Sequence, residues 1–180
     1  MSVQEVLRMG HPILHQIARP VGDANTAEIQ QLIHDLRDTM RARNGAGLAA
    51  PQIGQSVQVV IYGTGLPNPR YPGAPIIAET VLINPSLEPI GTEVESGWEG
   101  CLSVPGLRGE VRRWKQLRIQ ALDSSGQEFE RVVEGFEARV IQHECDHLNG
   151  ILFPQKLTSS QHFGYIEELI RSGQIPAVPG

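Results

Sequence analysis

Hydrophobic residues recur at helical spacing near both ends of the chain, and strand-like runs lie between them. Asn25 and Glu28 form a capping-box pattern, and apolar residues then recur every third or fourth position until Asn44. A second segment, flanked by Gly135 and Gly150, carries apolar residues on two sides of a helix. This pattern predicts helices over residues 25–44, 135–150 and about 159–171.

The central part of the chain has the spacing of strands rather than helices. β-Branched and aromatic residues gather in short runs between turn residues, and the last two runs form a hairpin. The predicted strands cover residues 57–62, 80–84, 93–98, 117–122 and 128–134. We therefore expect an α+β fold of one domain, residues 1–180, with largely antiparallel sheets packed around the helix of residues 135–150 and with an N-terminal and a C-terminal helix.

Composition and charge exclude several classes of protein. The 180 residues are 40% hydrophobic and 19% charged, with a net charge of −5 and no block of like charges, so we expect no dedicated nucleic-acid or membrane surface. No apolar run approaches the roughly 20 residues of a membrane span, and the first residues do not resemble a signal peptide. Cys101 and Cys145 are too few for a disulfide framework, and Cys145 is expected to be a small core residue. We expect a cytoplasmic protein.

Residues 142–150 read QHECDHLNG and contain an HExxH motif. His143 and His147 are four residues apart, so on a helix they share one face and can bind one divalent metal. Glu144 follows the first histidine and is placed to act on a water at that metal without ligating it. Apolar residues flank the motif on both sides, which predicts a buried helix rather than a solvated one.

A catalytic site built on two histidines needs a third protein ligand and one open position. Glu167 or Glu168, on the predicted last helix, would complete the ligand set of a thermolysin-like peptidase. Cys101 is the other candidate, because glycines and Pro105 around it allow its loop to fold close to a metal. A third alternative is a structural site closed by four protein ligands. The residues alone leave all three open.

Residues 45–52, GAGLAAPQ, are a run of small residues, which indicates that the backbone comes close to another group. The glycines suggest a phosphate-binding loop, but the third glycine and the lysine of that motif are missing. Pro51 also prevents a continuing helix. The residues by themselves favour a tight turn that enters a strand.

Three separated motifs resemble those of the peptide deformylase family. They are GAGLAAPQ at residues 45–52, EGCLS at residues 99–103 and QHECDHLNG at residues 142–150, and the resemblance covers at least residues 5–155. It implies a metal-dependent hydrolase that removes the N-formyl group from the N-terminal formylmethionine of newly synthesised polypeptides and releases formate. The implied partners are N-formylmethionyl nascent peptides at the ribosome exit.

The resemblance also assigns roles to individual residues. It implies metal ligation by Cys101, His143 and His147, with water as the fourth ligand. The implied cofactor is one divalent metal per chain, usually Fe²⁺, although Zn²⁺, Ni²⁺ and Co²⁺ also fit this ligand set. Glu144 resembles the general acid and base of the family.

Further positions match the family's oxyanion and substrate contacts. The side-chain amide of Gln52 and the backbone N–H of Leu102 match the donors that hold the developing oxyanion. Gly45, Gly47 and Leu48 lie in the first motif, where the backbone contacts the substrate. A close-fitting backbone at this point helps to exclude acyl groups larger than formyl.

The remaining site residues surround the predicted metal. Glu99 and Arg113 match a family salt bridge that supports the metal loop. On a helical wheel, Phe136 and Val140 share the face of the two histidines and form an apolar wall that could receive a methionine side chain. Arg139 falls on the rim of that face, where family members more often carry an apolar residue.

Overall fold

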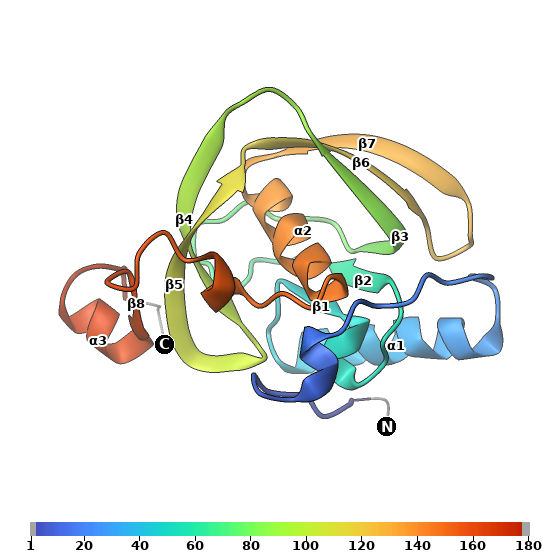
Figure 1. Cartoon of the computed structure of the whole chain (residues 1–180), viewed down its shortest axis with the longest axis horizontal. Coiled ribbons are helices and arrows are strands. Elements are labelled where there is room, and N and C mark those ends of the chain that lie inside the picture. The colour runs from blue at the N-terminus through green and yellow to red at the C-terminus, as the bar shows by residue number, and fades with distance from the viewer. Residues whose placement is uncertain (1–2, 178–180) are drawn as a thin grey trace.

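Two antiparallel sheets and their connecting helices make up the structure, a computed structural model that describes residues 3–177 (Figure 1). The predicted α+β class with antiparallel sheets is confirmed. The chain ends of the predicted domain, residues 1–2 and 178–180, lie outside the described residues. In chain order, with η for a 3₁₀ helix, the elements are η1 (Pro12–His15), α1 (Ala27–Ala42), β1 (Gly47–Ala49), η2 (Ala50–Ile53), β2 (Val59–Tyr62), β3 (Thr80–Pro89), β4 (Val94–Cys101), β5 (Val104–Trp114), β6 (Gln116–Leu122), β7 (Glu128–Glu134), α2 (Gly135–Leu148), η3 (Phe153–Lys156), β8 (Phe163–Tyr165) and α3 (Ile166–Arg171).

The larger sheet has five strands in the order β1-β2-β3-β6-β7. Side chains alternate between its two faces: Val60 and Tyr62 of β2 pack in the cluster that contains α2, whereas Val59 and Ile61 pack in the cluster that contains α1. This part of the sheet is therefore buried on both faces, and β1 is left as an edge strand.

The smaller sheet has the order β4-β5-β8, so that β4 is an edge strand as well. The strand β5 was not predicted, because its two glycines and several arginines conceal its apolar positions. Pairing with β4 and β8 nevertheless extends it over 11 residues. The register of β4 shifts between Glu99 and Cys101, which turns the end of the strand toward α2.

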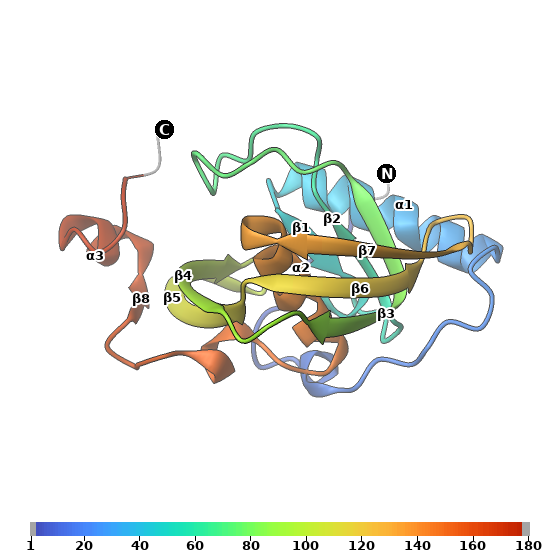
Figure 2. The same cartoon turned by 90° about the horizontal axis from the view of Figure 1, so that it is seen from above.

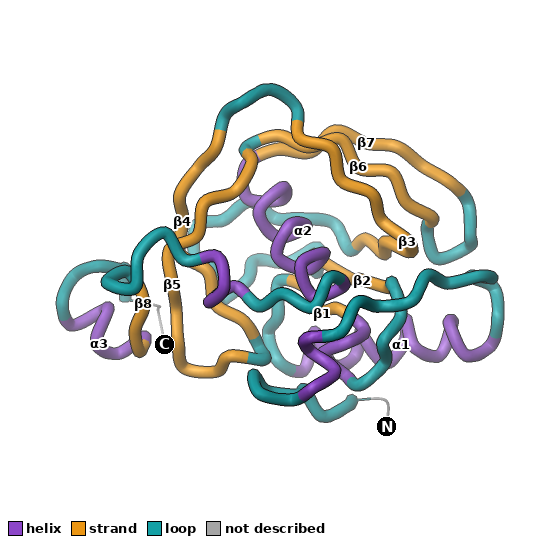
Figure 3. The backbone as a smooth tube through the Cα atoms, viewed as in Figure 1, coloured by secondary structure: helices purple, strands orange, loops and turns teal. Residues whose placement is uncertain are grey.

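Helix α2 lies at the centre of the molecule. The tube in Figure 3 shows it between the strands β1 and β2 and the strands β6 and β7, and Figure 2 shows β6 and β7 running across it. Most of its apolar residues, including Ile141 and Cys145, are buried, as predicted for a helix that is apolar on two sides. No helix among residues 3–177 is long and apolar enough to cross a membrane.

Two helix boundaries differ from prediction. Thr26, rather than Asn25, is the N-cap of α1, and its hydroxyl accepts a hydrogen bond from the Ile29 N–H. The last helix is shorter than predicted, because residues 163–165 pair with β5 as the strand β8 before α3 begins. The small-residue run 45–52, predicted as a tight turn that enters a strand, contains the edge strand β1, which the 3₁₀ helix η2 follows.

The two candidate caps of α1 can be separated by mutation. We expect Thr26→Ala to lower the free energy of unfolding by about 1 kcal/mol, since one of the first helical N–H groups loses its acceptor. Asn25→Ala should change it by less than about 0.5 kcal/mol. Urea unfolding monitored by circular dichroism measures both changes. A larger effect at Asn25 would show that Asn25, as predicted from sequence, is the N-cap.

Candidate metal centre

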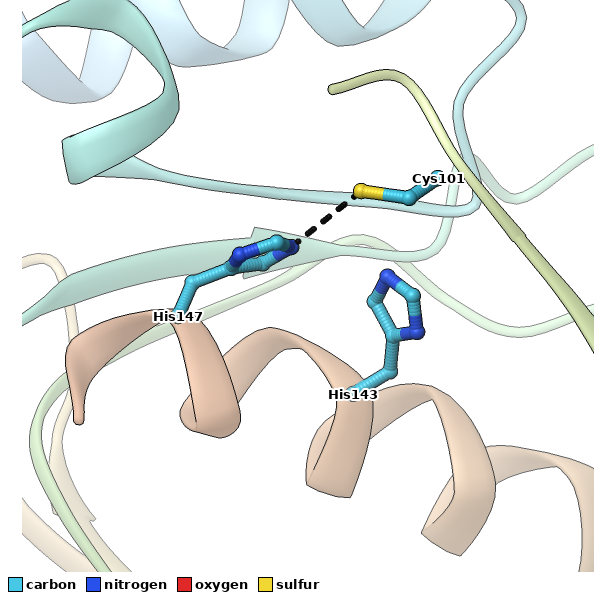
Figure 4. A group of neighbouring side chains, drawn as sticks. All are labelled: Cys101, His143 and His147. Carbon is cyan, nitrogen blue, oxygen red and sulfur yellow. Dashed lines mark hydrogen bonds between the residues drawn. The ribbon is translucent and has the colours of Figure 1, made fainter. Parts of the chain in front are cut away.

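Three buried side chains converge between α2 and the end of β4. The ligand atoms of Cys101, His143 and His147 all lie within 4.8 Å of one another. The two histidines project from successive turns of α2, and Figure 4 shows Cys101 facing them, with its Sγ 3.4 Å from His147 Nε2. The structure thus brings together the two HExxH histidines and the cysteine 42 residues before the first of them.

A buried ionic network orients the first histidine. His143 Nδ1 lies 2.8 Å from Glu99 Oε2, so the other ring nitrogen, Nε2, is the one available to a metal. Arg113 donates to both oxygens of Glu99, at 2.8 and 2.9 Å, and also to Asp146 Oδ2 at 2.5 Å. The predicted pair of Glu99 and Arg113 is present, whereas the contribution of Asp146 was not foreseen from sequence.

The charges around the three donors suit a divalent cation. Burial alone would raise the pKa of the Cys101 thiol, but the adjacent His147 and His143 outweigh burial and hold that pKa well below its ordinary value. Burial also opposes ionisation of Glu99, yet hydrogen bonds from Arg113 and His143 lower the pKa of its carboxyl. A thiolate and two imidazoles are a donor set that zinc and similar transition metals accept.

Glu144 lies beside the three donors, against the backbone of Gly47. It is buried, and its Oε2 has no hydrogen-bond partner among the residues that the structure describes. Burial raises the pKa of this carboxyl, and the Cys101 sulfur adds to that effect against the opposing histidines. A Cβ atom on Gly47 would lie 2.6 Å from Glu144 Oε1, so only glycine leaves room for the carboxylate.

Gln52 is held with its amide directed at the site. Its Oε1 accepts a hydrogen bond of 2.9 Å from the Ala49 N–H. This contact directs Nε2 toward Ser103 Oγ, at 3.1 Å, and Cys101 Sγ, at 3.5 Å. Leu102, the other predicted oxyanion donor, lines the same cavity next to Cys101.

The cavity at the centre is small and opens into a larger groove. Its volume is about 30 Å³, and its walls include Gly47, Gln52, His143 and Glu144. A neighbouring groove of about 340 Å³ adjoins it. The residues that line both spaces are Arg70, Tyr71, Phe136 and Arg139.

The predicted substrate-contacting residues divide into two groups. Gly47, Phe136, Val140 and Arg139 line the cavity. The side chain of Leu48 instead packs in the core beside α1. Gly45 lies against Leu102 and Met40 and is not part of the cavity wall.

Arg139 lines the cavity, as expected of a residue on the rim of the histidine face, but its guanidinium is bound within the protein. It is buried, and its guanidinium donates to Glu99 Oε1 and to the carbonyl oxygens of Glu95 and Val111. The helical wheel gave the direction of the side chain correctly. It could not show that strands β4 and β5 cover that direction and supply acceptors.

Two loop residues of the site were missed from sequence. Tyr71 follows a Pro/Gly-rich stretch, and its hydroxyl lies within hydrogen-bond distance of both the N–H and the carbonyl oxygen of Gly100. The ring of Tyr71 packs against Phe136, with the ring centroids 5.2 Å apart. Arg70 lies beside it on the cavity wall. A long loop without periodicity carries no sequence signal for these contacts.

The alternative ligands on the last helix are wrong. Glu167 and Glu168 are exposed on α3, and Glu168 pairs with Arg171 at 2.6 Å. Neither residue belongs to the cluster that could hold a metal. A thermolysin-like ligand set is therefore not present among the described residues.

An HExxH helix whose two histidines meet a third donor beside a buried carboxylate is the arrangement of a metal-dependent hydrolase. A model of the polypeptide deformylase family matches residues 3–163. The chain belongs to this family. Its enzymes remove the N-formyl group from the N-terminal methionine of newly synthesised polypeptides, and the chain is one of these hydrolases.

Relatives and solved structures agree with this assignment. Peptide deformylase 1 of Prochlorococcus marinus is 57% identical over 175 residues, which cover 97% of this chain and 91% of that protein. Peptide deformylase 1 of Nitrosomonas europaea is 53% identical over 93% of this chain and 94% of that protein. The Met-Ala-Ser-bound class I type b peptide deformylase of Acinetobacter baumannii superposes with a TM-score of 0.83 at 44% identity, covering 87% of this chain and 100% of that one. The actinonin complex of a peptide deformylase from Synechococcus elongatus gives a TM-score of 0.79 at 31% identity over 98% of this chain and 89% of that one.

Metal content tests the ligand set directly. We expect Cys101→Ala to weaken metal binding by more than about 100-fold. Loss of a residue that only hydrogen-bonds to a metal ligand already lowers metal affinity by about 10–100-fold. Cys145→Ala removes the other buried cysteine and should retain the metal, as should Glu168→Gln. Mass spectrometry of the metal after gel filtration measures this, and full metal content in Cys101→Ala would refute the cysteine as a ligand.

Proposed function

We propose that Cys101, His143 and His147 hold one divalent cation and that deformylation takes place in the small cavity beside them. The observation that carries this proposal is the position of Glu144. This buried carboxylate lies next to three metal donors, and one of its oxygens has no hydrogen-bond partner among the described residues. Burial of a carboxylate oxygen without such a partner lowers the stability of the fold. A catalytic role explains why such an oxygen is retained.

Glu144 is the general base and then the general acid. It takes a proton from the water that attacks the formyl carbon, and it later delivers this proton to the nitrogen of the leaving peptide. Its raised pKa suits both steps, because a carboxyl that ionises closer to neutral pH accepts and releases a proton more readily. The cation, when bound, supplies Lewis-acid chemistry and favours the ionisation of water near neutral pH.

Gln52 and Leu102 stabilise the negative charge that develops on the formyl oxygen. The Gln52 amide is fixed at its carbonyl end by the Ala49 N–H, so its NH₂ group needs little reorganisation during the reaction. The Leu102 backbone N–H is the second donor. Both residues line the cavity that contains Glu144 and the three metal donors.

The size of the cavity accounts for the choice of a formyl group. A volume of about 30 Å³ accommodates on the order of two waters, which is close to the size of a formyl group. Gly47 forms one wall, and its backbone lies directly against Glu144. A larger acyl group would meet this backbone, which cannot withdraw as a side chain would.

The peptide portion of the substrate extends away from this cavity. Phe136 and Val140 form an apolar wall of the cavity. Such a wall suits the apolar side chain of the substrate's methionine. The adjoining groove of about 340 Å³ falls in the size range of ordinary ligand sites. Both β1 and β4 are edge strands, so each has backbone groups on one side that an extended peptide could pair with. Gly45 and Leu48 would contact such a peptide only through their backbone.

We further propose Fe²⁺ as the metal in the cell, because the thiolate and two imidazoles suit a borderline transition metal. Zn²⁺, Ni²⁺ or Co²⁺ would fit the same donors. Formylated nascent chains at the ribosome exit are the proposed substrates, and the cytoplasm is the proposed location. Residues 1–180 would act as one catalytic domain.

Replacement of Glu144 tests the proposed chemistry. Glu144→Gln should lower kcat for formate release from formyl-Met-Ala-Ser by about 10²–10⁴-fold, since it can no longer transfer the proton. Metal content should stay at the wild-type level. Glu137→Gln, in the first turn of the same helix, serves as the matched control. Assays are run with Ni²⁺ in air or Fe²⁺ without oxygen, and wild-type protein that binds metal but releases no formate would disprove the proposal.

The oxyanion contact gives a separate prediction. Gln52→Glu keeps the acceptor for Ala49 but replaces the NH₂ donor by a carboxylate oxygen. We expect kcat to fall by about 10²–10³-fold, with KM changed much less because the contact strengthens only as charge develops. Gln55→Glu, three residues away and exposed, controls for the added charge. If KM instead rises by that factor while kcat stays unchanged, Gln52 contributes only to substrate binding.

A further inference from the structure

The segment of residues 4–9, called the N-terminal arm here, contacts both parts of the chain that supply the proposed oxyanion donors. The Leu7 N–H donates to the backbone carbonyl oxygen of Gln52 at 2.8 Å. Two residues further on, the Met9 N–H donates to the carbonyl oxygen of Ser103 at 2.7 Å. Residues 4–9 belong to no helix or strand, so neither N–H is used by regular secondary structure.

These two bonds complete a closed ring of contacts at the oxyanion donors. The side-chain nitrogen of Gln52 lies 3.1 Å from Ser103 Oγ. Gln52 and Ser103 are therefore joined twice, directly by their side chains and through the arm by their carbonyl oxygens. Leu102, whose N–H is the second proposed donor, directly precedes Ser103. The ring thus connects two donors that lie far apart in the chain.

Neither the arm nor its acceptors can move at low cost. Gln52 is 1% exposed and Ser103 is 0% exposed, so a carbonyl oxygen that lost its donor there would not regain a partner from solvent. The arm itself is fastened to α1. The Gln4 N–H donates to Thr39 Oγ1 at 2.9 Å, and Gln4 Nε2 donates to Asp35 Oδ2 at 3.0 Å.

Packing alone does not account for the position of the arm. The side chain of Leu7 does pack against the cluster that contains Leu14 and Cys101. The Met9 side chain contributes little in this way, because 49% of the residue is exposed. The Met9 N–H nevertheless makes the shorter of the two bonds. At this residue the contact with the site is made by the backbone.

We propose that the N-terminal arm is a positioning element for the reaction. Through the N–H groups of Leu7 and Met9, it sets the distance between the Gln52 amide and the Leu102 N–H. The inference rests on the proposed function, since it assumes that these two donors act on a formyl oxygen. Donors that are held in place beforehand need no reorganisation when negative charge develops. Leu7 and Met9 do not line the cavity and act only through the backbone of their acceptors.

Proline substitution removes a single N–H and tests the arm. We expect Leu7→Pro and Met9→Pro each to lower kcat for formate release from formyl-Met-Ala-Ser by at least about tenfold, but by less than the roughly 10²–10³-fold that loss of a whole oxyanion donor costs. KM should change much less, because the donors act mainly as charge develops. Metal content should stay at the wild-type level.

Two control variants separate the N–H from other effects. Arg8→Pro introduces proline between the two positions, and the Arg8 N–H has no hydrogen-bond partner among residues 3–177, so kcat should stay near the wild-type value. Leu7→Ala removes the packed side chain but keeps the N–H. It should lower the free energy of unfolding and leave kcat near the wild-type value.

A double-mutant comparison distinguishes positioning from a general loss of structure. In Gln52→Glu the amide donor is already absent, so Leu7→Pro added to that variant should lower kcat by less than about threefold. A purely structural effect would lower kcat by the same factor in both backgrounds. If Leu7→Pro does not fold, 2-hydroxy-4-methylpentanoic acid in place of Leu7 removes the same N–H as an ester and keeps the side chain.

The outcomes separate this inference from the proposed function. If wild-type protein releases formate and both Leu7→Pro and Met9→Pro retain the kcat of Arg8→Pro, the arm has no positioning role while deformylation stands. An equal loss in the wild-type and Gln52→Glu backgrounds also overturns the inference. Metal-loaded wild-type protein that releases no formate overturns the proposed function as well. A fall in kcat that requires the Gln52 amide supports the positioning role.

Discussion

The burial of the Glu99 carboxylate is the constraint on which the site depends. Only 2% of this residue is exposed, so its charge must be compensated within the protein. Arg113 donates to both of its oxygens, Arg139 adds a donor to Oε1, and His143 lies against Oε2. These partners come from β5 and from two turns of α2, while Glu99 itself lies on β4. One carboxylate thus fixes the strand that carries Cys101 relative to the helix that carries both histidines.

Two glycines on the edge strands have related roles. Gly47 on β1 leaves space for Glu144, and Gly97 on β4 leaves space for Arg139. Both side chains belong to α2, which lies between these strands (Figure 1). In each case the glycine provides volume rather than an unusual backbone conformation. The helix can therefore bring charged groups against the backbone of both strands without separating them.

The buried ionisable groups of the site lower the stability of the fold, but they also provide the protonation states that the reaction needs. Burial raises the pKa of Glu144, whereas the histidines lower that of the Cys101 thiol despite burial. Neighbouring groups in one small cavity are therefore driven toward different protonation states, as acid–base catalysis beside a metal requires. Arg113 and Arg139 offset the negative charges of Glu99 and Asp146, so the network around the metal donors remains close to neutral. Such a network is costly to bury unless every member is paired.

The sequence by itself determined the elements with clear periodicity and the chemistry with fixed local spacing. The helix that carries His143 and His147 was predicted because four-residue spacing places two side chains on one face whatever surrounds them. The residues alone left Cys101 as one of several alternatives for the third donor, and the resemblance to the family implied it; its position beside the histidines, and the buried contacts of Arg139 and Tyr71, depended on the tertiary structure. Each of them involves residues far apart in the chain, and their positions follow from strand pairing and from the burial of Glu99. Local spacing cannot encode which distant backbone will cover a given helix face, and that choice decided where the third metal donor and the walls of the cavity lie.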